Sequence, residues 1–472
     1  MAPLDTIQRI LGSAVSFDHD AVTVHDASVL ASDKMDELVR LAVFGETDEK
    51  HWARWAIWEL GQVVGVRSGS IHDLYAARGR GEIRGFTVPA INVRGSSYLT
   101  ARSIFRTAVS QKAGAFLLEI ARSEIAYTEQ RPSEYIAVML AAALREGFRG
   151  PVFIQGDHFQ VNAKKFAVDP VAEVGAVKQL ALEAIHSGFF NIDIDTSTLV
   201  ELSHPTLDAQ QRLNYETAVA ITRYVRSLEP AGVTISLGGE IGEVGTENST
   251  VPELEAFMNG YNRTLVKAAP GVAGISKISV QSGTSHGGTV LADGSIKDVK
   301  LDFRTLEKLG AVAREKYGLS GAVQHGASTL PDNEFDHFPR VETAEIHLAT
   351  GFQNMLYDHL PDALRNEIYD WLGTHAIEER KATDTDEQFF YKTRKKALGP
   401  FKKQLWSLPA ATIAALEAAY DKKFGFLFTQ LGVGGTAAYV AQYIKLAPMH
   451  RMAPTDGGHS VAAAPDDPDA GE

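Results

Sequence analysis

A repeated alternation of short apolar segments with longer amphipathic ones, starting near Phe86, constrains the fold of this chain more than any other feature. The short segments are rich in valine, isoleucine and leucine, whereas the longer ones carry apolar residues at helical spacing. Most of the short segments are apolar enough to be buried on both faces, which is typical of parallel strands. The predicted strands cover residues 87–93, 115–120, 152–155, 190–193, 234–237, 277–280, 321–324 and 344–348.

Helical patterns fill the connections between these strands. They cover residues 98–113, 133–146, 171–187, 210–227, 251–269 and 303–317, and the connection at 331–342 is short and irregular. Strand–helix units in one parallel sheet are joined by right-handed crossovers, and eight of them close into a ring. The sequence therefore predicts an α/β protein, a TIM (β/α)₈ barrel over residues 86–351 that carries the catalytic chemistry.

The flanking regions are predicted as additions to the barrel. Residues 1–85 are expected to form an N-terminal helical extension, with helices near 33–44 and 50–66. Residues 352–450 are expected to form a C-terminal helical region that packs on the barrel or on a partner. Residues 451–472, rich in Ala, Asp, Pro and Gly, are predicted to be a disordered tail.

Charge and composition narrow the classes of function. The formal net charge of −13 argues against nucleic-acid binding as the main role. The chain has no cysteine, so any transition metal must be held by histidine and carboxylate. No apolar run is long enough to span a membrane, and we expect a cytoplasmic protein without a membrane partner.

Chemically capable side chains end several of the predicted strands. The segment Pro151–His158 is a buried strand that ends in Asp157 and His158. In a barrel the C-terminal ends of all strands lie at one rim, where barrel enzymes place their active sites. Later strands end in the same way, at Asp193, Asp195, Glu240, His286 and His325.

Three of these residues, His158, His286 and His325, are imidazoles on different strands. A single histidine is more often a core or surface residue than a metal ligand. Three at one rim, however, match the donors of a catalytic zinc site that keeps an open position. We therefore predict a site for Zn²⁺ or another divalent metal at these three residues.

The carboxylates at the same rim have more than one reading. Asp157 is placed to act as a general acid/base or to orient a metal ligand. Asp195 and Glu240 are expected to face the same mouth, with a helix cap or a loop salt bridge as the alternative for each. The glycine-rich segments 238–245 and 283–288 can offer backbone N–H groups to a phosphate, which by itself is weak evidence.

Six motifs, taken in chain order, resemble those of the class II, metal-dependent fructose/tagatose-bisphosphate aldolases. The resemblance runs from about Phe86 to Gly351 and identifies the chain as a divergent member. Residues 1–85 and the helices after Gly351 lie outside the usual pattern of the family. The motifs are Phe86-Thr-Val-Pro-Ala-Ile-Asn92, Gly156-Asp157-His158, Asp195-Thr-Ser197, Glu240-Ile-Gly-Glu-Val-Gly245, Gly283-Thr-Ser-His286-Gly and His325-Gly-Ala-Ser328.

The resemblance implies roles for individual residues. His158, His286 and His325 match the zinc ligands, and Asp157 matches the acid/base at the aldehyde oxygen. Glu247 falls where the family keeps a proton-abstracting glutamate. Asp195 and Glu240 match carboxylates of the metal pocket or of a second metal position. The substrate- and phosphate-binding positions are Asn92, Ser123, Gly287, Gly326, Ser328, His347 and Thr350.

The resemblance also implies partners. A sugar phosphate is the expected substrate, a monovalent cation is a further expected cofactor, and a homo-oligomer, either a dimer or a tetramer, is the expected assembly.

Departures from the family pattern surround the predicted substrate. Strand eight reads Glu345-Ile-His347-Leu-Ala-Thr350, so an acidic residue replaces a basic one and His347 replaces an asparagine. After strand two, Arg122-Ser123-Glu124 adds a charged pair in place of a small-residue turn. These changes indicate a different sugar phosphate, or an unphosphorylated or acidic sugar.

Three functional hypotheses follow from these observations. The leading one is a lyase, an aldolase that cleaves or forms a C–C bond in a ketose (bis)phosphate through a zinc-stabilised enediolate. The second is a metal-dependent sugar or sugar-acid epimerase on the same scaffold, which His347 and Arg122 favour. The third is a non-catalytic, aldolase-like subunit, for which lost metal ligands would be the signature; all three histidines are present.

Overall fold

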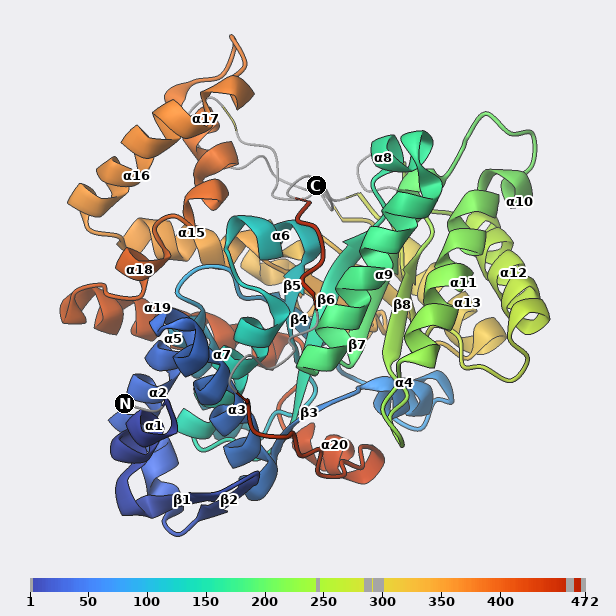
Figure 1. Ribbon diagram of the computed structural model, residues 1–472. Helices are drawn as coiled ribbons and strands as arrows, with labels where there is room; N and C mark the ends of the chain where they lie inside the picture. The colour runs from blue at the N-terminus through green and yellow to red at the C-terminus, as the bar shows by residue number, and fades with distance from the viewer. Residues whose placement is uncertain (1–2, 243–246, 284–290, 292–300, 456–461, 468–472) are drawn as a thin grey trace.

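The computed structural model describes residues 3–242, 247–283, 291, 301–455 and 462–467. Eight parallel strands form a closed ring in which the last strand pairs with the first. Helices surround the ring (Figure 1), so the predicted TIM barrel with N- and C-terminal extensions is confirmed. The strands are β4 (Val88–Asn92), β5 (Leu117–Ala121), β6 (Gly150–Gln160), β7 (Asn191–Asp195), β8 (Ser236–Glu240), β9 (Lys277–Ser279), β10 (Ala322–Gln324) and β11 (Glu345–Leu348).

Every predicted strand overlaps one of these eight, and each predicted helix of the barrel is present. The helices bury one apolar stripe each against strands that are buried on both faces, which is why both patterns are legible in the sequence. The helices that follow the barrel strands are α5 (Ser97–Gln111), α6 (Arg122–Tyr127), α7 (Pro132–Arg145), α8 (Ala163–Val168), α9 (Pro170–Ser187), α10 (Leu207–Gln210), α11 (Arg212–Ser227), α12 (Val251–Ala268), α13 (Phe303–Tyr317), α14 (His337–Arg340) and α15 (Thr350–His359).

The N-terminal region contains strands as well as the expected helices. β1 (Val15–Asp18) and β2 (Ala21–Val24) form an antiparallel hairpin. β3 (Val66–Gly69) pairs with the first residues of β6 and adds a ninth strand beside the ring. The helices of this region are α1 (Pro3–Leu11), α2 (Asp33–Phe44), α3 (Thr47–Val64) and α4 (His72–Gly79).

The C-terminal region wraps back over the molecule. Its helices are α16 (Asp362–His375), α17 (Asp386–Thr393), α18 (Lys402–Leu405), α19 (Ala410–Gln430) and α20 (Ala437–Tyr443). The indole N–H groups of Trp55 and Trp58 on α3 donate to the carbonyls of Arg451 and Met449, at 2.9 and 2.7 Å. Residues 451–455 and 462–467 of the predicted tail are thus described, and they lie against the rest of the fold.

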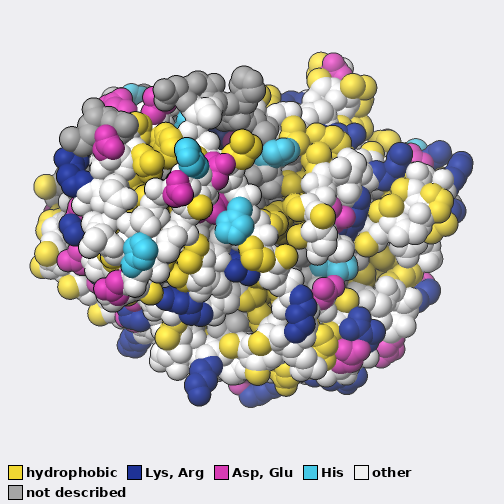
Figure 2. Space-filling model, turned by 60° about the horizontal axis from the view of Figure 1, so that its bottom comes forward, with side chains coloured by type: hydrophobic (Ala, Val, Ile, Leu, Met, Phe, Trp, Pro, Cys, Tyr) yellow, Lys and Arg dark blue, Asp and Glu magenta, His cyan; other side chains and the backbone are white. Residues whose placement is uncertain are grey.

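No helix in the described part of the chain is both long and apolar enough to cross a membrane. On the face shown in Figure 2, basic and acidic side chains are interspersed with apolar and neutral ones. The excess of acidic over basic residues is therefore not gathered into one field on this face.

Candidate metal centre at the barrel mouth

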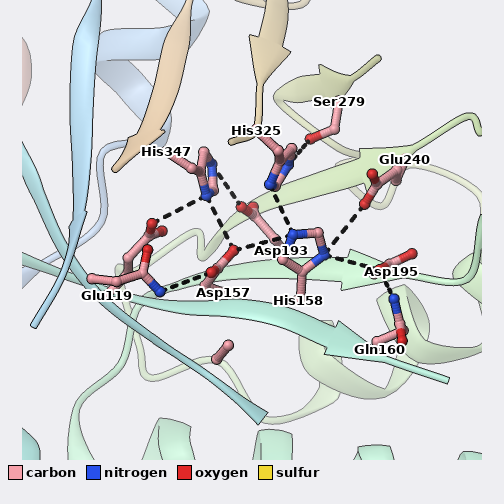
Figure 3. A network of polar contacts seen from close by, with 12 residues as sticks. Glu119, Asp157, His158, Gln160, Asp193, Asp195, Glu240, Ser279, His325 and His347 are labelled. Carbon is pink, nitrogen blue, oxygen red and sulfur yellow. Dashed lines mark hydrogen bonds and ion pairs between the residues drawn. The ribbon is translucent and has the colours of Figure 1, made fainter. Parts of the chain in front are cut away.

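An irregularity in β6 positions two of the predicted site residues. The register between β6 and β7 shifts between Gly156 and Phe159. A side chain at position 156 would place its Cβ 2.4 Å from the Phe159 ring, and His158 has a left-handed backbone with φ of 39°. Side chains of a regular strand alternate between its two faces. The irregularity instead lets both Asp157 and His158 reach the barrel mouth (Figure 3). Backbone strain of this kind is typical of functional sites.

The rings of His158 and His325 face each other. His158 Nε2 lies 2.8 Å from His325 Nδ1. The opposite nitrogen of His158 contacts a carboxylate oxygen of Asp195 at 2.9 Å and one of Glu240 at 3.5 Å. The opposite nitrogen of His325 lies 2.9 Å from the Ser279 hydroxyl. Partners on the far nitrogen orient a metal-binding imidazole, so both near nitrogens are presented to a common point.

These side chains fit a divalent metal. One ligand atom each from Asp157, His158 and His325 lies within 4.8 Å of the other two, and all three residues are buried. We call these three residues the metal group. Imidazole nitrogen together with carboxylate oxygen is a donor set that Zn²⁺ accepts. His286, the third predicted ligand, lies outside the described residues.

The electrostatics of the metal group follow from charge pairing under burial. Burial acts to lower the pKa of His158, but Asp157, Glu240 and Asp195 raise it to about 10. Burial acts to raise the pKa of Asp157, but the charges of His158 and His347 hold it well below its usual range. A metal binds the neutral imidazole, so binding of a metal at this point would release a proton.

A set of charged side chains lies in the barrel interior below the metal group. Glu119, Asp193, Lys277 and Glu345 project from β5, β7, β9 and β11, which are alternate strands of the ring. Alternate strands normally contribute one layer of four bulky apolar side chains to a barrel core. Here that layer is charged, and with His347 above it we call these five residues the charged layer.

Lys277 is the centre of the charged layer. Its Nζ lies 2.9 Å from Asp193 Oδ1, donates to Gln155 Oε1 at 2.9 Å and pairs with Glu345. A Cβ at Gly238 would come within 2.2 Å of the Asp193 carboxylate, so the absence of a side chain there makes room for the pair. Burial acts to raise the pKa of Glu345, but Lys277 and His347 lower it to about 2.

His347 joins the charged layer to the metal group. Its Nδ1 lies 3.1 Å from Asp157 Oδ1 and 3.1 Å from Glu119 Oε1, as Figure 3 shows. Its Nε2 lies 2.8 Å from Glu345 Oε1. Burial and the charge of Asp157 raise the pKa of Glu119 to about 8, so this carboxyl holds a proton at neutral pH. Two groups that exchange protons are therefore next to Asp157.

The structure also places the predicted substrate-binding residues. Asn92, at the end of β4, donates to Asp157 Oδ2 at 3.0 Å, and Ser123 is buried at the start of α6. Gly326 and Ser328 lie in the turn after β10, which packs against Gly351 at the start of α15, beside Thr350. Glu247 is exposed and lies just after residues 243–246. Gly287 lies outside the described residues.

Sequence reasoning missed Glu119 and Lys277 of the charged layer as part of the site. Glu119 belongs to a strand whose other residues are apolar, Lys277 begins a strand that is buried throughout, and such charged residues are rarely buried without a partner. A charged residue inside a strand buried on both faces is the signal that would have identified them. Their pairing across the barrel depends on strand register, which the sequence alone does not give.

Comparison with known proteins agrees with this geometry. The model of the family described as fructose-bisphosphate aldolase class-II matches residues 79–406. The match covers more than half of the chain, and the protein belongs to this family. No curated protein matches the chain significantly.

Two solved structures with TM-scores above 0.5 illustrate the fold. A fructuronate-tagaturonate epimerase from Cohnella laeviribosi has a TM-score of 0.55 and 13% identity, and the alignment covers 90% of each chain. A probable tagatose 6 phosphate kinase from Sinorhizobium meliloti has a TM-score of 0.52 and 15% identity, over 76% of this chain and 99% of that one. At these identities the likeness shows the fold alone.

Proposed function

We propose that the protein is a metal-dependent aldolase that cleaves or forms a C–C bond in a ketose phosphate. The observation that carries this proposal is the facing pair of His158 and His325, with Asp157 beside them in one buried group. Membership of the class II aldolase family supports the same reaction class. An aldol-type reaction needs both an acceptor for negative charge on carbon and oxygen and a carboxylate that moves a proton.

The proposed metal ligands are His158, His325 and His286. A divalent ion held there supplies a Lewis acid for the carbonyl and hydroxyl oxygens of a ketose. Asp195 and Ser279 orient the two described imidazoles through their far nitrogens. This makes a lysine that forms a Schiff base unnecessary for the reaction.

Asp157 is the proposed acid/base at oxygen. Its pKa lies well below the usual range, so its carboxylate is ionised at neutral pH and can accept the hydroxyl proton during cleavage. Asn92 donates to one of its oxygens and His347 contacts the other. In the condensation direction the same carboxyl returns the proton to the aldehyde oxygen. Glu247 is the proposed group for the proton on carbon.

A second candidate function is epimerisation of a ketose or sugar acid at the same metal site. His347 favours it, because this residue places an imidazole between Asp157 and the protonated carboxyl of Glu119. An enzyme that inverts a stereocentre without releasing fragments must return a proton or a carbonyl fragment on the opposite face. The fold likeness to an epimerase of fructuronate and tagaturonate over 90% of both chains is in line with this candidate.

One product assay separates the two candidates. The metal-loaded enzyme is incubated with ketose mono- and bisphosphates and with ketose uronates, and the products are analysed for triose release and for epimers. Aldolase activity predicts a triose fragment, whereas epimerase activity predicts a product with unchanged carbon number. Neither product from any substrate of the panel would contradict both candidates.

Two variants serve as controls for this assay. Asp157→Asn should abolish either reaction, since it removes the proposed acid/base while keeping the size of the side chain. His347→Asn should leave triose release largely intact, because the family uses asparagine at this position, but it should abolish epimerisation. Equal loss of both products in His347→Asn would remove the argument for a separate epimerase role.

A further inference from the structure

The last described residues of the chain lie at the barrel mouth. Figure 1 shows this C-terminal segment next to α6, at the end of the barrel from which α8 and α9 also start. Asp467 is only 1% exposed there, and its Oδ2 lies 2.9 Å from Lys165 Nζ on α8 and 3.4 Å from Arg122 Nη2 on α6. Asp466 pairs with Arg131 at 2.6 Å. The tail thus inserts a carboxylate between two cations.

Arg122 is held in position by contacts that do not involve the C-terminal tail. The residue is 3% exposed, and its Nη1 donates to Glu173 Oε1 at 2.6 Å and to the Gln160 carbonyl at 2.7 Å. Its Nε is buried and has no hydrogen-bond partner among the described residues. Both side-chain oxygens of Asp467 are likewise buried without a well-formed hydrogen bond in the described part of the chain. The Asp467 carboxylate therefore balances the positive charge of the site, but it does not accept a hydrogen bond from Arg122 Nε.

The charges of the site call for an anion. Arg122 and Lys165 are two cations, and Glu173 is one carboxylate, which leaves one net positive charge before Asp467 is counted. Arg122 is buried and paired with Glu173, whereas Lys165 is half-exposed, so an anion between the two cations meets one positive charge that Glu173 does not balance. An oxyanion with several acceptor oxygens would also use the unpaired Arg122 Nε.

The site is connected to the metal group through two residues, Gln160 and Asp195. Gln160, whose carbonyl accepts from Arg122, donates from its side-chain amide to Asp195 Oδ2 at 2.6 Å. Asp195 in turn holds the far nitrogen of His158, and Figure 3 shows Gln160 and Asp195 side by side. An anion at Arg122 therefore lies at the same mouth as the proposed reaction.

We propose that Arg122 and Lys165 form an anion-binding site for the charged end of the substrate, and that Asp467 occupies it as an intramolecular competitor in the absence of substrate. The ligand is the phosphate or the carboxylate of a ketose whose reacting carbons lie at the metal group. This inference rests on the proposed function for the identity of the substrate. The anion site itself can be tested without turnover.

The test measures binding of inorganic phosphate and of acetate to the full-length, metal-loaded protein by isothermal titration calorimetry. Lys165→Met removes one cation and should weaken anion binding about two- to fivefold, the range typical of a half-exposed charge pair. Asp467→Asn removes the competing charge and should strengthen binding by about the same factor. Opposite signs for the two variants are the expected result. If the affinity for phosphate falls more than that for acetate in Lys165→Met, the preferred group is a phosphate. The reverse result identifies a carboxylate.

Lys164→Met is the matched control. Lys164 is an exposed lysine on the same helix, and its replacement changes the net charge by the same amount. It should leave both affinities unchanged. Unchanged binding in Lys165→Met and Asp467→Asn, or a shift of both variants in the same direction, would overturn the proposal. These outcomes are independent of the product assay, so a failed anion site and a failed aldolase assignment are distinguishable.

Discussion

The metal group and the charged layer occupy the same barrel, but their charges serve different ends. In the metal group the far nitrogens of the imidazoles are paired and the near nitrogens face a common point. In the charged layer, Lys277 directs its ammonium toward Asp193, Gln155 and Glu345. The first arrangement turns two imidazole nitrogens toward one point, where a metal would bind, whereas in the second the ammonium group is bonded to other side chains. Burial alone therefore does not identify a functional charge; the direction of its remaining ligand atoms does.

The largest expected effect comes from removing a proposed ligand of the metal group. His158→Ala should lower metal content and reduce kcat/KM at least about 100-fold, since even loss of a partner behind a ligand typically costs 10–100-fold. Metal analysis and the product assay measure the two effects. His51→Ala, which removes an exposed histidine, should change neither. Full metal occupancy in His158→Ala would contradict the assignment of this ligand.

The charged layer should show the opposite signature, with a large effect on stability. Lys277→Met removes the cation that contacts both Asp193 and Glu345, leaves these buried carboxylates to His347, and should lower the free energy of unfolding by about 3–5 kcal/mol. Urea unfolding of metal-free protein measures this loss. Lys316→Met removes an exposed pair with Glu255 and should cost less than about 1 kcal/mol. Similar losses in both variants would show that the buried pairs are not compensated by Lys277.

These two regions were not equally predictable from the sequence. The barrel and its strand ends follow from local patterns, since a strand buried on both faces and a helix with one apolar stripe are each visible within a short window. His158, His325 and Asp157 stand at such strand ends and could be listed in advance. Their contacts to one another come from the ring closure, which the strand count already implied.

The remaining features depend on distances between residues far apart in the chain. Lys277 meets Glu345 only because β9 and β11 lie on either side of β10 at a particular register. Arg122 was linked to the substrate in general terms, but its partners Glu173 and Asp467 come from α9 and from a tail predicted to be disordered. β3 is too short to distinguish from a loop by its pattern alone.

Asp195→Asn tests whether loss of a residue that orients a metal ligand has a smaller effect than loss of the ligand His158 itself. The amide cannot carry the charge that now faces His158 Nδ1 at 2.9 Å, so metal affinity should fall about 10–100-fold while the fold is retained. Competition with a chelator of known affinity measures the change. Asp208→Asn, which removes an exposed carboxylate paired with Arg263, should leave metal affinity unchanged. An unchanged metal affinity in Asp195→Asn would show that the contact between Asp195 and His158 has no part in metal binding.

A further expected effect concerns the pH dependence of stability, and it involves Glu119 of the charged layer. Burial and the charge of Asp157 raise the pKa of Glu119 to about 8, against an ordinary value of 4.5. Between these values the folded protein holds a proton that the unfolded chain has released. Stability from this group is therefore complete below about pH 4.5 and is lost as the pH rises toward 8.

Glu119→Gln keeps the size of the side chain and cannot titrate. Metal-free wild-type protein should lose stability between pH 5 and 8, and this variant should show a flatter curve, as measured by urea unfolding at several pH values. Glu255→Gln, at an exposed position, should keep the slope of the wild type. If Glu119→Gln keeps that slope as well, the titration belongs to another group, and the proton beside His347 that favours the epimerase candidate is not there.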